Sequence, residues 1–330
     1  MVRTVIRGVG GYVPERVVTN KDLEKLMDTS DEWIRERTGI QERRWVTTQQ
    51  NHELGLEASR VALSRAGIGP QDVDLILYAT LSMEYTFPGS GVLLQDKLGC
   101  RTIGALDIRN QCSGFLYGLA VADGMIRSGL YRNVLLVGSE VHSTRIDLST
   151  LGRDVAVLFG DGAGAVVLGP GEDDSKGLLS VHLHCEGKHH DLLWIEGHGS
   201  LFPHAEQVRV IQERRHLPQM DGRQVFVHAV RRMPEVLQEA LQANGLSIQD
   251  IDLLLPHQAN LRINQKVAAT LGIPESKVVN NIQKYGNTTA ATIPLCLWNA
   301  LDEGRVHDGS LLAMVAFGSG FTWASALYRW

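Results

Sequence analysis

The sequence has few cysteines, no long apolar run and no excess of basic residues. Its 4 cysteines among 330 residues have no paired spacing, which is typical of free thiols in a reducing, cytoplasmic setting. The apolar runs are too short and too interrupted to span a membrane. Charge and glycine break the apolar stretch of the first residues, so a signal peptide is not expected. The net charge of −5 argues against non-specific binding of nucleic acid.

An internal duplication is the clearest feature that the sequence does contain. With 44% hydrophobic residues, the chain can build two domains or one large duplicated fold. The segment QDVDLIL at Gln71 returns as QDIDLLL at Gln249, 178 positions later, and both copies follow a helical pattern and a glycine. This repeated unit predicts two similar α/β halves, residues 1–170 and 171–330, with sheets covered on both faces.

A second, weaker match relates the segments that begin at Cys112 and at Asn287, 175 positions apart. Each predicts a helix of about five turns, then a glycine, a linker and an apolar strand. Cys112 and Asn287 are therefore expected in equivalent places, at the N-terminus of the long helix of each half. His257 follows the apolar strand LLLP of the second copy, and ligands of such sheets bind beyond the carboxyl ends of the strands. The three residues are predicted to converge on one site.

These residue types permit a definite chemistry. A thiol at a helix N-terminus feels the positive end of the helix dipole, which favours the thiolate, and a thiolate attacks thioesters. The structural alternatives are a buried cysteine for Cys112, a hydrogen-bonded strand-end imidazole for His257 and a helix N-cap for Asn287. Together the three can form a protease-like triad, in which Asn orients His. They can also form a thioester-condensing site, in which His and Asn both donate to an enolate oxygen.

Three further segments were candidates for sites. AFGSGFTW, residues 316–323, predicts a tight turn after a strand, and its backbone N–H groups, Ser319 among them, could complete an oxyanion hole with the amide of Cys112. GDGAGAVVLG at Gly160 continues as a strand, which is the wrong context for a dinucleotide-binding loop. HLHCEGKHH from His182 has possible ligand spacing, but alternating histidines on a strand favour exposed side chains, so no metal is expected.

The cysteine segment, TSDEWIRERTGI, FGDGAGAVVL, PHQANLRI, GNTTAA and FGSGFTWASALYRW together resemble the β-ketoacyl-acyl-carrier-protein synthase III family of thiolase-like condensing enzymes. The resemblance covers essentially the whole chain. It implies a five-layered α-β-α-β-α fold from two similar halves, and a cytoplasmic homodimer without metal or redox cofactor. It also implies a ping-pong reaction: an acyl-CoA acylates the cysteine, and a malonyl thioester, on carrier protein or on CoA, then loses CO2 and attacks the acyl-enzyme to give a 3-oxoacyl thioester.

The resemblance assigns roles to individual positions. Cys112 matches the acyl-accepting nucleophile, and His257 and Asn287 match the pair that stabilises the carbanion left by decarboxylation. The remaining matches are the CoA and pantetheine contacts, the acyl pocket and dimer contacts, and the carrier-protein face: Trp33, Arg37, Arg153 and Asn260; Phe87 and Phe317; and Arg262.

Several positions depart from the pattern of the fatty-acid-initiating members. QCSGF stands where small residues such as ACAGF are common, and the segment between Trp194 and Phe226 is longer than in simple initiators. Val227 and Ala269 stand where lysines often meet the acidic carrier protein. Four arginines could supply that charge instead: Arg209, Arg214, Arg215 and Arg223. These departures keep open a condensing or acyl-transfer enzyme of secondary metabolism with a different donor or acceptor. Less favoured are a non-catalytic acyl-CoA-binding protein and a cysteine hydrolase.

Overall fold

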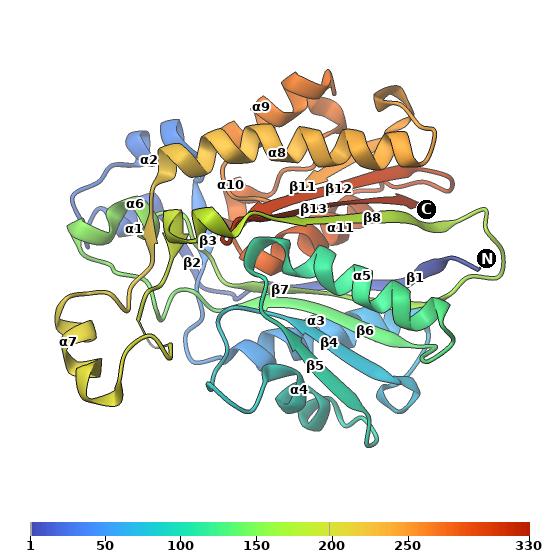
Figure 1. Ribbon diagram of the computed structural model, residues 1–330, viewed down its shortest axis with the longest axis horizontal. Coiled ribbons are helices and arrows are strands. Elements are labelled where there is room, and N and C mark those ends of the chain that lie inside the picture. The colour runs from blue at the N-terminus through green and yellow to red at the C-terminus, as the bar shows by residue number, and fades with distance from the viewer. Residues whose placement is uncertain (1, 198) are drawn as a thin grey trace.

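Two β-sheets organise the chain, of which the computed structural model describes residues 2–197 and 199–330 (Figure 1). The first sheet has the strand order β1-β7-β6-β4-β5, and the second has the order β11-β12-β13-β8. Three of the pairings are parallel, β4 with β5 and with β6, and β11 with β12. The strands are β1 Thr4–Tyr12, β4 Leu75–Ala79, β5 Gly104–Ile108, β6 Val134–Glu140, β7 Gly162–Pro170, β8 Gly177–Cys185, β11 Leu253–Pro256, β12 Leu311–Gly318 and β13 Thr322–Arg329.

Helices cover both faces of each sheet and complete five layers (Figure 1). Helices α3 (Asn51–Ala66) and α4 (Ser90–Leu98) share one apolar core with the outer face of the first sheet. A second core joins both sheets to the two central helices, α5 (Gly114–Arg127) and α11 (Thr292–Asp302). A third packs α8 and α9 on the outer face of the second sheet; their bounds are Gly222–Ala243 and Leu261–Leu271. The expected five-layered α-β-α-β-α fold is confirmed.

The first sequence repeat corresponds to a repeated structural unit. Helix α3 ends at Gly67, a 3₁₀ turn (η1, Pro70–Asp72) follows, and the chain enters β4; α8 leads through Gly245 and η6 (Ile248–Asp250) into β11 in the same way. Gly67 and Gly245 have φ of 68° and 63°, the left-handed region that favours glycine. The fold repeats with the period of the sequence because the same helix stop is used twice.

The second match needs a correction of three residues. Cys112 and Asn287 do not begin the long helices: α5 is preceded by the 3₁₀ turn η2 (Gln111–Ser113), and α11 by η8 (Thr289–Ala291). The first residue of each turn is left-handed, with φ 47° at Gln111 and 49° at Thr289, and these two are again 178 positions apart. Cys112 is therefore equivalent to Ala290, and Asn287 lies three residues ahead of that position. The match was aligned on the glycines that follow the two long helices. The segment between the turn and the glycine is longer after η2 than after η8, so this alignment set Asn287 opposite Cys112.

Smaller elements flank one end of the sheets. The ribbon of β2 (Val17–Thr19) and β3 (Glu42–Arg44) shares a small core with four short helices and the loop before β7. These helices are α1 Asn20–Leu23, α2 Asp31–Thr38, α6 Arg153–Ala156 and α10 Ile282–Tyr285. The chain between β9 (Leu193–Trp194) and β10 (Gln219–Met220) forms an arm that carries α7 (Gln207–Gln212) and projects from the body (Figure 1). Among the described residues, every helix is too short or too polar to cross a bilayer.

Candidate active site

Cys112 lies buried in η2, closely covered by the turn after β12. A Cβ added to Gly318 would lie 2.7 Å from the Cβ and 3.2 Å from the Sγ of Cys112, so only glycine allows this approach. The backbone N–H groups of Cys112 and Ser319 both lie against the thiol sulfur. Two N–H groups that meet beside a nucleophile form the arrangement of an oxyanion hole. The Ser319 hydroxyl points elsewhere, since it donates to the carbonyl of Leu193.

The surroundings of Cys112 disfavour its thiolate form. Burial raises its pKa to about 12, with a further contribution from the nearby Glu140 carboxyl, and the two N–H groups only partly oppose this. The expectation that a helix dipole favours the thiolate is wrong for the resting site. The physical reason is that desolvation of the anion outweighs the favourable dipoles, so Cys112 needs a base at the moment of attack.

His257 is a neutral imidazole with one ring nitrogen that has no hydrogen-bond partner in the described part of the chain. It directly follows β11, as the sequence predicts, and its backbone N–H donates to the carbonyl of Val315 at 2.8 Å. Burial lowers the pKa of its imidazole to about 3. Its Nδ1 lies 2.7 Å from Thr292 Oγ1, whereas its buried Nε2 has no hydrogen-bond partner among the described residues. A buried polar atom without a partner is costly, and substrate binding would satisfy it.

The hydroxyl of Thr292 decides what His257 Nε2 can do. This hydroxyl lies 2.8 Å from the carbonyl of Thr289 and 2.7 Å from His257 Nδ1, and it has one proton. When Thr292 donates to Thr289, Nδ1 carries the imidazole proton and Nε2 is a base. When Thr292 donates to Nδ1, Nε2 carries the proton and is a donor. The same ring can therefore serve as acceptor or donor at neutral pH.

Asn287 has a fixed backbone and a fixed carboxamide oxygen. Its N–H donates to Leu158 O at 2.8 Å, and its carbonyl accepts from Gly160 N at 3.1 Å. Its Oδ1 accepts from Thr289 N at 2.8 Å, which leaves the Nδ2 group as a donor. The turn η8, which follows Asn287, contacts η2, which carries Cys112, and η2 also contacts β12. The predicted trio is thus held by elements that touch one another.

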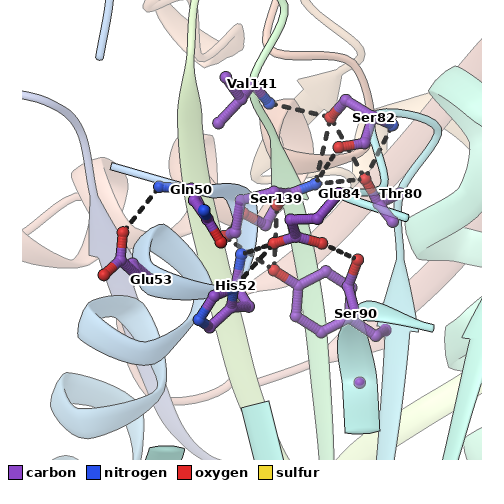
Figure 2. Close-up of polar contacts among 12 residues, drawn as sticks. Gln50, His52, Glu53, Thr80, Ser82, Glu84, Ser90, Ser139 and Val141 are labelled. Carbon is purple, nitrogen blue, oxygen red and sulfur yellow. Dashed lines mark hydrogen bonds and ion pairs between the residues drawn. The ribbon is translucent and has the colours of Figure 1, made fainter. Parts of the chain in front are cut away.

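Sequence reasoning missed the polar groups that support this trio. Glu140, the last residue of β6, is fully buried beside Cys112, and burial raises its pKa to about 7. Its carboxyl accepts from Ser82 Oγ, Thr80 Oγ1 and the N–H of Leu81, part of a buried network that Figure 2 shows around Ser82 and Thr80. The signal was present in the sequence, because VLLVGSE places a carboxylate at the end of an otherwise apolar strand.

The predicted CoA contacts lie together on the surface. The indole of Trp33 in α2 has the Arg37 guanidinium 5.0 Å from its centroid and the Arg153 guanidinium at 4.7 Å. Such stacking uses the negative face of the aromatic ring. Asn260 caps α9 and donates from Nδ2 to the carbonyl of Arg37 at 2.9 Å. Four residues from three separate parts of the sequence therefore meet at one surface.

The other predicted positions differ in exposure. Phe87 is 84% exposed, while Phe317 is buried and packs against Phe321 and Trp323 with ring centroids 4.8 and 6.4 Å away. Arg262 is exposed at the start of α9. These placements leave the assigned roles as predictions.

Most of the arginines that could contact an acidic carrier protein are paired with carboxylates of this chain. Arg209 pairs with Glu213, Arg214 with Asp147, and Arg215 with Glu196. Of the four arginines proposed to replace the missing lysines, Arg223 alone has no acidic partner within 4.0 Å among the described residues. The replacement hypothesis therefore rests on Arg223 together with Arg262.

The histidine-rich segment makes two clusters. His182 and His184 on β8 both hydrogen-bond the carboxylate of Glu239 in α8, at 3.0 and 2.6 Å. A second group, Glu186, His189 and His228, could hold a metal ion by its geometry. The carboxylate of Glu186 is already paired with Arg232 and Lys188, which compete with a cation.

The duplicated five-layered fold and the buried cysteine, histidine and asparagine define a thiolase-like condensing enzyme. Family models described as 3-oxoacyl-(acyl-carrier-protein) synthase III and its C-terminal part match residues 106–187 and 241–330. The β-ketoacyl-(acyl-carrier-protein) synthase III of Rhodospirillum centenum is 46% identical over 334 residues, covering 100% of this chain and 99% of that protein. The chain belongs to the β-ketoacyl-acyl-carrier-protein synthase III family, and it is an acyltransferase of the condensing type.

Solved structures agree with this assignment. The crystal structure of 3-oxoacyl-(acyl-carrier-protein) synthase III from Aquifex aeolicus VF5 has a TM-score of 0.92 and 42% identity, over 99% of this chain and 100% of that one. The priming β-ketosynthase of a polyketide biosynthetic pathway has a TM-score of 0.91 and 34% identity, over 99% and 96%. Both primary and secondary metabolism are thus represented among its structural neighbours.

Proposed function

We propose that this enzyme joins an acyl group from acyl-CoA to a malonyl thioester through acyl-Cys112, as a starting step of fatty acid synthesis. The observation that carries the proposal is the state of His257, a buried, neutral imidazole whose Nε2 has no partner among the described residues, together with Asn287, whose Oδ1 is held so that Nδ2 remains as a donor. A hydrolytic triad would instead need Asn287 bonded to the histidine. Here the asparagine oxygen is held by a backbone N–H and the histidine Nδ1 by Thr292.

In the first half-reaction, Cys112 attacks the acyl-CoA carbonyl. His257 Nε2 accepts the thiol proton as the S–C bond forms, and passes it to the CoA sulfur as the old thioester bond breaks. The oxyanion of the tetrahedral intermediate faces the N–H groups of Cys112 and Ser319. A protonated resting thiol suits this scheme, because the anion forms only when an acyl group is present.

In the second half-reaction, the malonyl thioester loses CO2 and its C–C bonding pair becomes an enolate. The proposed donors to the enolate oxygen are His257 Nε2–H and Asn287 Nδ2–H, two neutral groups that suit a developing charge in a dry site. The enolate carbon then attacks the acyl carbonyl on Cys112, and the cysteine sulfur leaves and regains a proton. No metal or redox cofactor is part of this chemistry.

CoA is proposed to bind where Trp33, Arg37, Arg153 and Asn260 meet. The Arg153 guanidinium lies 4.7 Å from the indole centroid, so it would have to move away from Trp33 for an adenine to stack between the two; arginines also suit the CoA phosphates. The four free cysteines suit a reducing, cytoplasmic setting.

A homodimer through the edge strand β5 is also proposed. β5 is the last strand of its sheet, its Leu106 is 44% exposed, and an open edge of this kind invites pairing with a second copy. The exposed Phe87 would then reach the partner, where it would line the acyl pocket beside the partner's site. We keep residues 1–170 and 171–330 as the two proposed halves, and Phe317 as a proposed pocket residue.

The second substrate is proposed to be malonyl carrier protein, with Arg262 on the docking face. A secondary-metabolism reaction that uses a CoA thioester is the alternative, favoured by the exposed, uncharged Val227 and Ala269. The test is to incubate the protein with a panel of acyl-CoAs, weigh the intact chain, and then add malonyl carrier protein or malonyl-CoA. An adduct that persists in Cys112→Ala would refute the mechanism, and product from malonyl-CoA alone would select the alternative.

A further inference from the structure

The backbone of Thr289 orients both proposed donors. Its N–H donates to Asn287 Oδ1 at 2.8 Å, and its carbonyl lies 2.8 Å from Thr292 Oγ1. That hydroxyl in turn lies 2.7 Å from His257 Nδ1. The peptide groups of a single residue therefore set the direction of Asn287 Nδ2 and, through Thr292, that of His257 Nε2.

Thr289 holds this position at an energetic cost. It is fully buried and its φ is 49°, a left-handed conformation that β-branched residues rarely adopt. A residue of this kind persists only when its surroundings fix it. The contacts of the Thr289 side chain therefore bear directly on the alignment of the two donors.

His142 makes the decisive contact with that side chain. Its Nε2 lies 2.6 Å from Thr289 Oγ1. His142 is itself fixed, since its N–H donates to Asp161 Oδ1 at 2.7 Å and its ring packs on Phe159 with centroids 4.6 Å apart. Phe159 also pairs with Asn287 as a parallel bridge. The His142 imidazole thus packs on Phe159, which pairs with Asn287, and also contacts the hydroxyl of Thr289.

The neighbourhood of His142 is suited to a permanent, neutral contact. Burial lowers the pKa of His142 to about 3, with a smaller contribution from Arg145, so the ring is uncharged at neutral pH. Two residues earlier in the chain, the Glu140 carboxyl accepts the N–H of Ala290, the residue after Thr289. Glu140 at the end of β6 and His142 just after it therefore contact η8 at two successive residues, Ala290 and Thr289.

We propose that His142 is a positioning residue for the condensation half-reaction: by bonding the Thr289 hydroxyl it keeps the Thr289 backbone left-handed, which aims Asn287 Nδ2 and His257 Nε2 at the same oxygen. This inference rests on the proposed roles of Asn287 and His257. It predicts a selective effect, because condensation uses both donors whereas acylation uses His257 alone, so their misalignment harms condensation more than acylation.

The test compares His142→Phe, which fills the space without a hydrogen bond, with His142→Gln, which keeps a polar group there. Acylation of Cys112 by an acyl-CoA is followed by intact mass, and condensation by product formation from a malonyl thioester. We expect His142→Phe to lower condensation at least about tenfold more than acylation, and His142→Gln to recover most of that loss. His182→Phe is the control, since His182 bonds Glu239 and Ser180 on the other sheet and should leave both rates unchanged.

A second pair of variants protects the test against a folding defect in His142→Phe. Thr289→Val removes the hydroxyl at nearly constant volume, and Thr289→Ser retains it. We expect Thr289→Val to reproduce the selective loss, Thr289→Ser to restore it, and the double variant His142→Phe with Thr289→Val to be no worse than either single one. Equal loss of both half-reactions, additive losses, or full activity in His142→Phe and Thr289→Val overturns the proposal.

Failure of the proposed function gives a different result. If Asn287→Ala and His257→Ala both condense acyl groups like the unaltered enzyme, the roles of the donors are wrong whatever His142 does. If those two variants lose condensation while His142→Phe and Thr289→Val keep it, the proposed function stands and His142 is only a packing residue.

Discussion

The two 3₁₀ turns η2 and η8 have the same backbone conformation but different proposed roles in the reaction. Both begin with a left-handed residue, Gln111 or Thr289, and both lead into a central helix. In η2 the second residue is the proposed nucleophile Cys112, whose sulfur faces two N–H groups. In η8 the second residue is Ala290, and the first residue organises the neighbouring donors instead. One duplicated turn thus presents the reacting atom in one half and positions the donors of the reaction in the other.

This difference shows that the turn sets the backbone geometry, whereas the chemistry depends on the side chains that the turn carries. A left-handed start followed by a 3₁₀ turn buries the second residue of each turn, Cys112 in η2 and Ala290 in η8. Glu140 and His142 then secure η8 from the end of β6. Ser319 and Gly318 at the end of β12 cover η2. Each turn is held by a strand end of the other half, and four predictions can break or sharpen this comparison.

The largest effect is expected from Cys112→Ala, which removes the reacting atom from η2 and leaves η8 intact. Without a nucleophile, acylation disappears and condensation falls by at least about a thousandfold. Intact mass measured after incubation with acyl-CoA reads the adduct directly. The matched control is Cys296→Ala, another buried thiol, in the central helix of the other half, which should still gain one acyl group. An acyl adduct on Cys112→Ala would show that another residue is the nucleophile.

Gly318→Ala should cause the next largest loss. The new Cβ would lie 2.7 Å from the Cβ of Cys112, so η2 must move, and a displacement of the nucleophile by less than an ångström can cost up to about a hundredfold. Both half-reactions should fall together, because the reacting sulfur serves both. Gly124→Ala in α5 has open space around its Cβ and should keep activity while raising the stability by about 1 kcal/mol. Kinetics of each half-reaction and thermal unfolding check both variants.

The pH dependence of acylation separates an internal base from a free thiolate. The pKa of Cys112 is raised to about 12 and that of His257 is lowered to about 3, so neither group changes its charge between pH 6 and pH 8. A proton passed from Cys112 to His257 keeps the net charge constant, so over this range the acylation rate should change only as far as the Glu140 carboxyl beside Cys112, whose pKa is raised to about 7, changes its charge. In His257→Ala, hydroxide or water must remove the proton, and the rate should rise about tenfold per pH unit. A steep rise in the unaltered enzyme would show that Cys112 reacts as a pre-formed thiolate.

The sequence revealed the repeat, the strand before His257 and the turn at Ser319, because each depends on local pattern. It marked Glu140 by a carboxylate at the end of an apolar strand, but it could not reveal the contact of His142 with Thr289, since these two residues meet only through tertiary structure and have no diagnostic spacing. The misplaced equivalence of Cys112 and Asn287 has the same origin. A left-handed φ at Gln111 or Thr289 leaves no mark in residue type when the residue is not glycine. The expectation that Cys112 is a thiolate was wrong because it considered only the helix dipole, which the sequence pattern indicates. The burial that raises the pKa of Cys112 is not visible in the sequence.

The smallest effect, and the sharpest contrast between the turns, is expected from paired glycine variants. Gln111→Gly relieves a left-handed residue whose side chain makes no hydrogen bond in the described structure, so the backbone gain of about 1 kcal/mol is only partly offset by the entropy of the unfolded glycine. Thermal unfolding should show equal or slightly higher stability, with acylation unchanged. Thr289→Gly relieves the same strain but loses the hydroxyl contact with His142, so condensation should fall although the backbone is freer. Equal behaviour of the two variants would mean that the turns differ only in the cysteine.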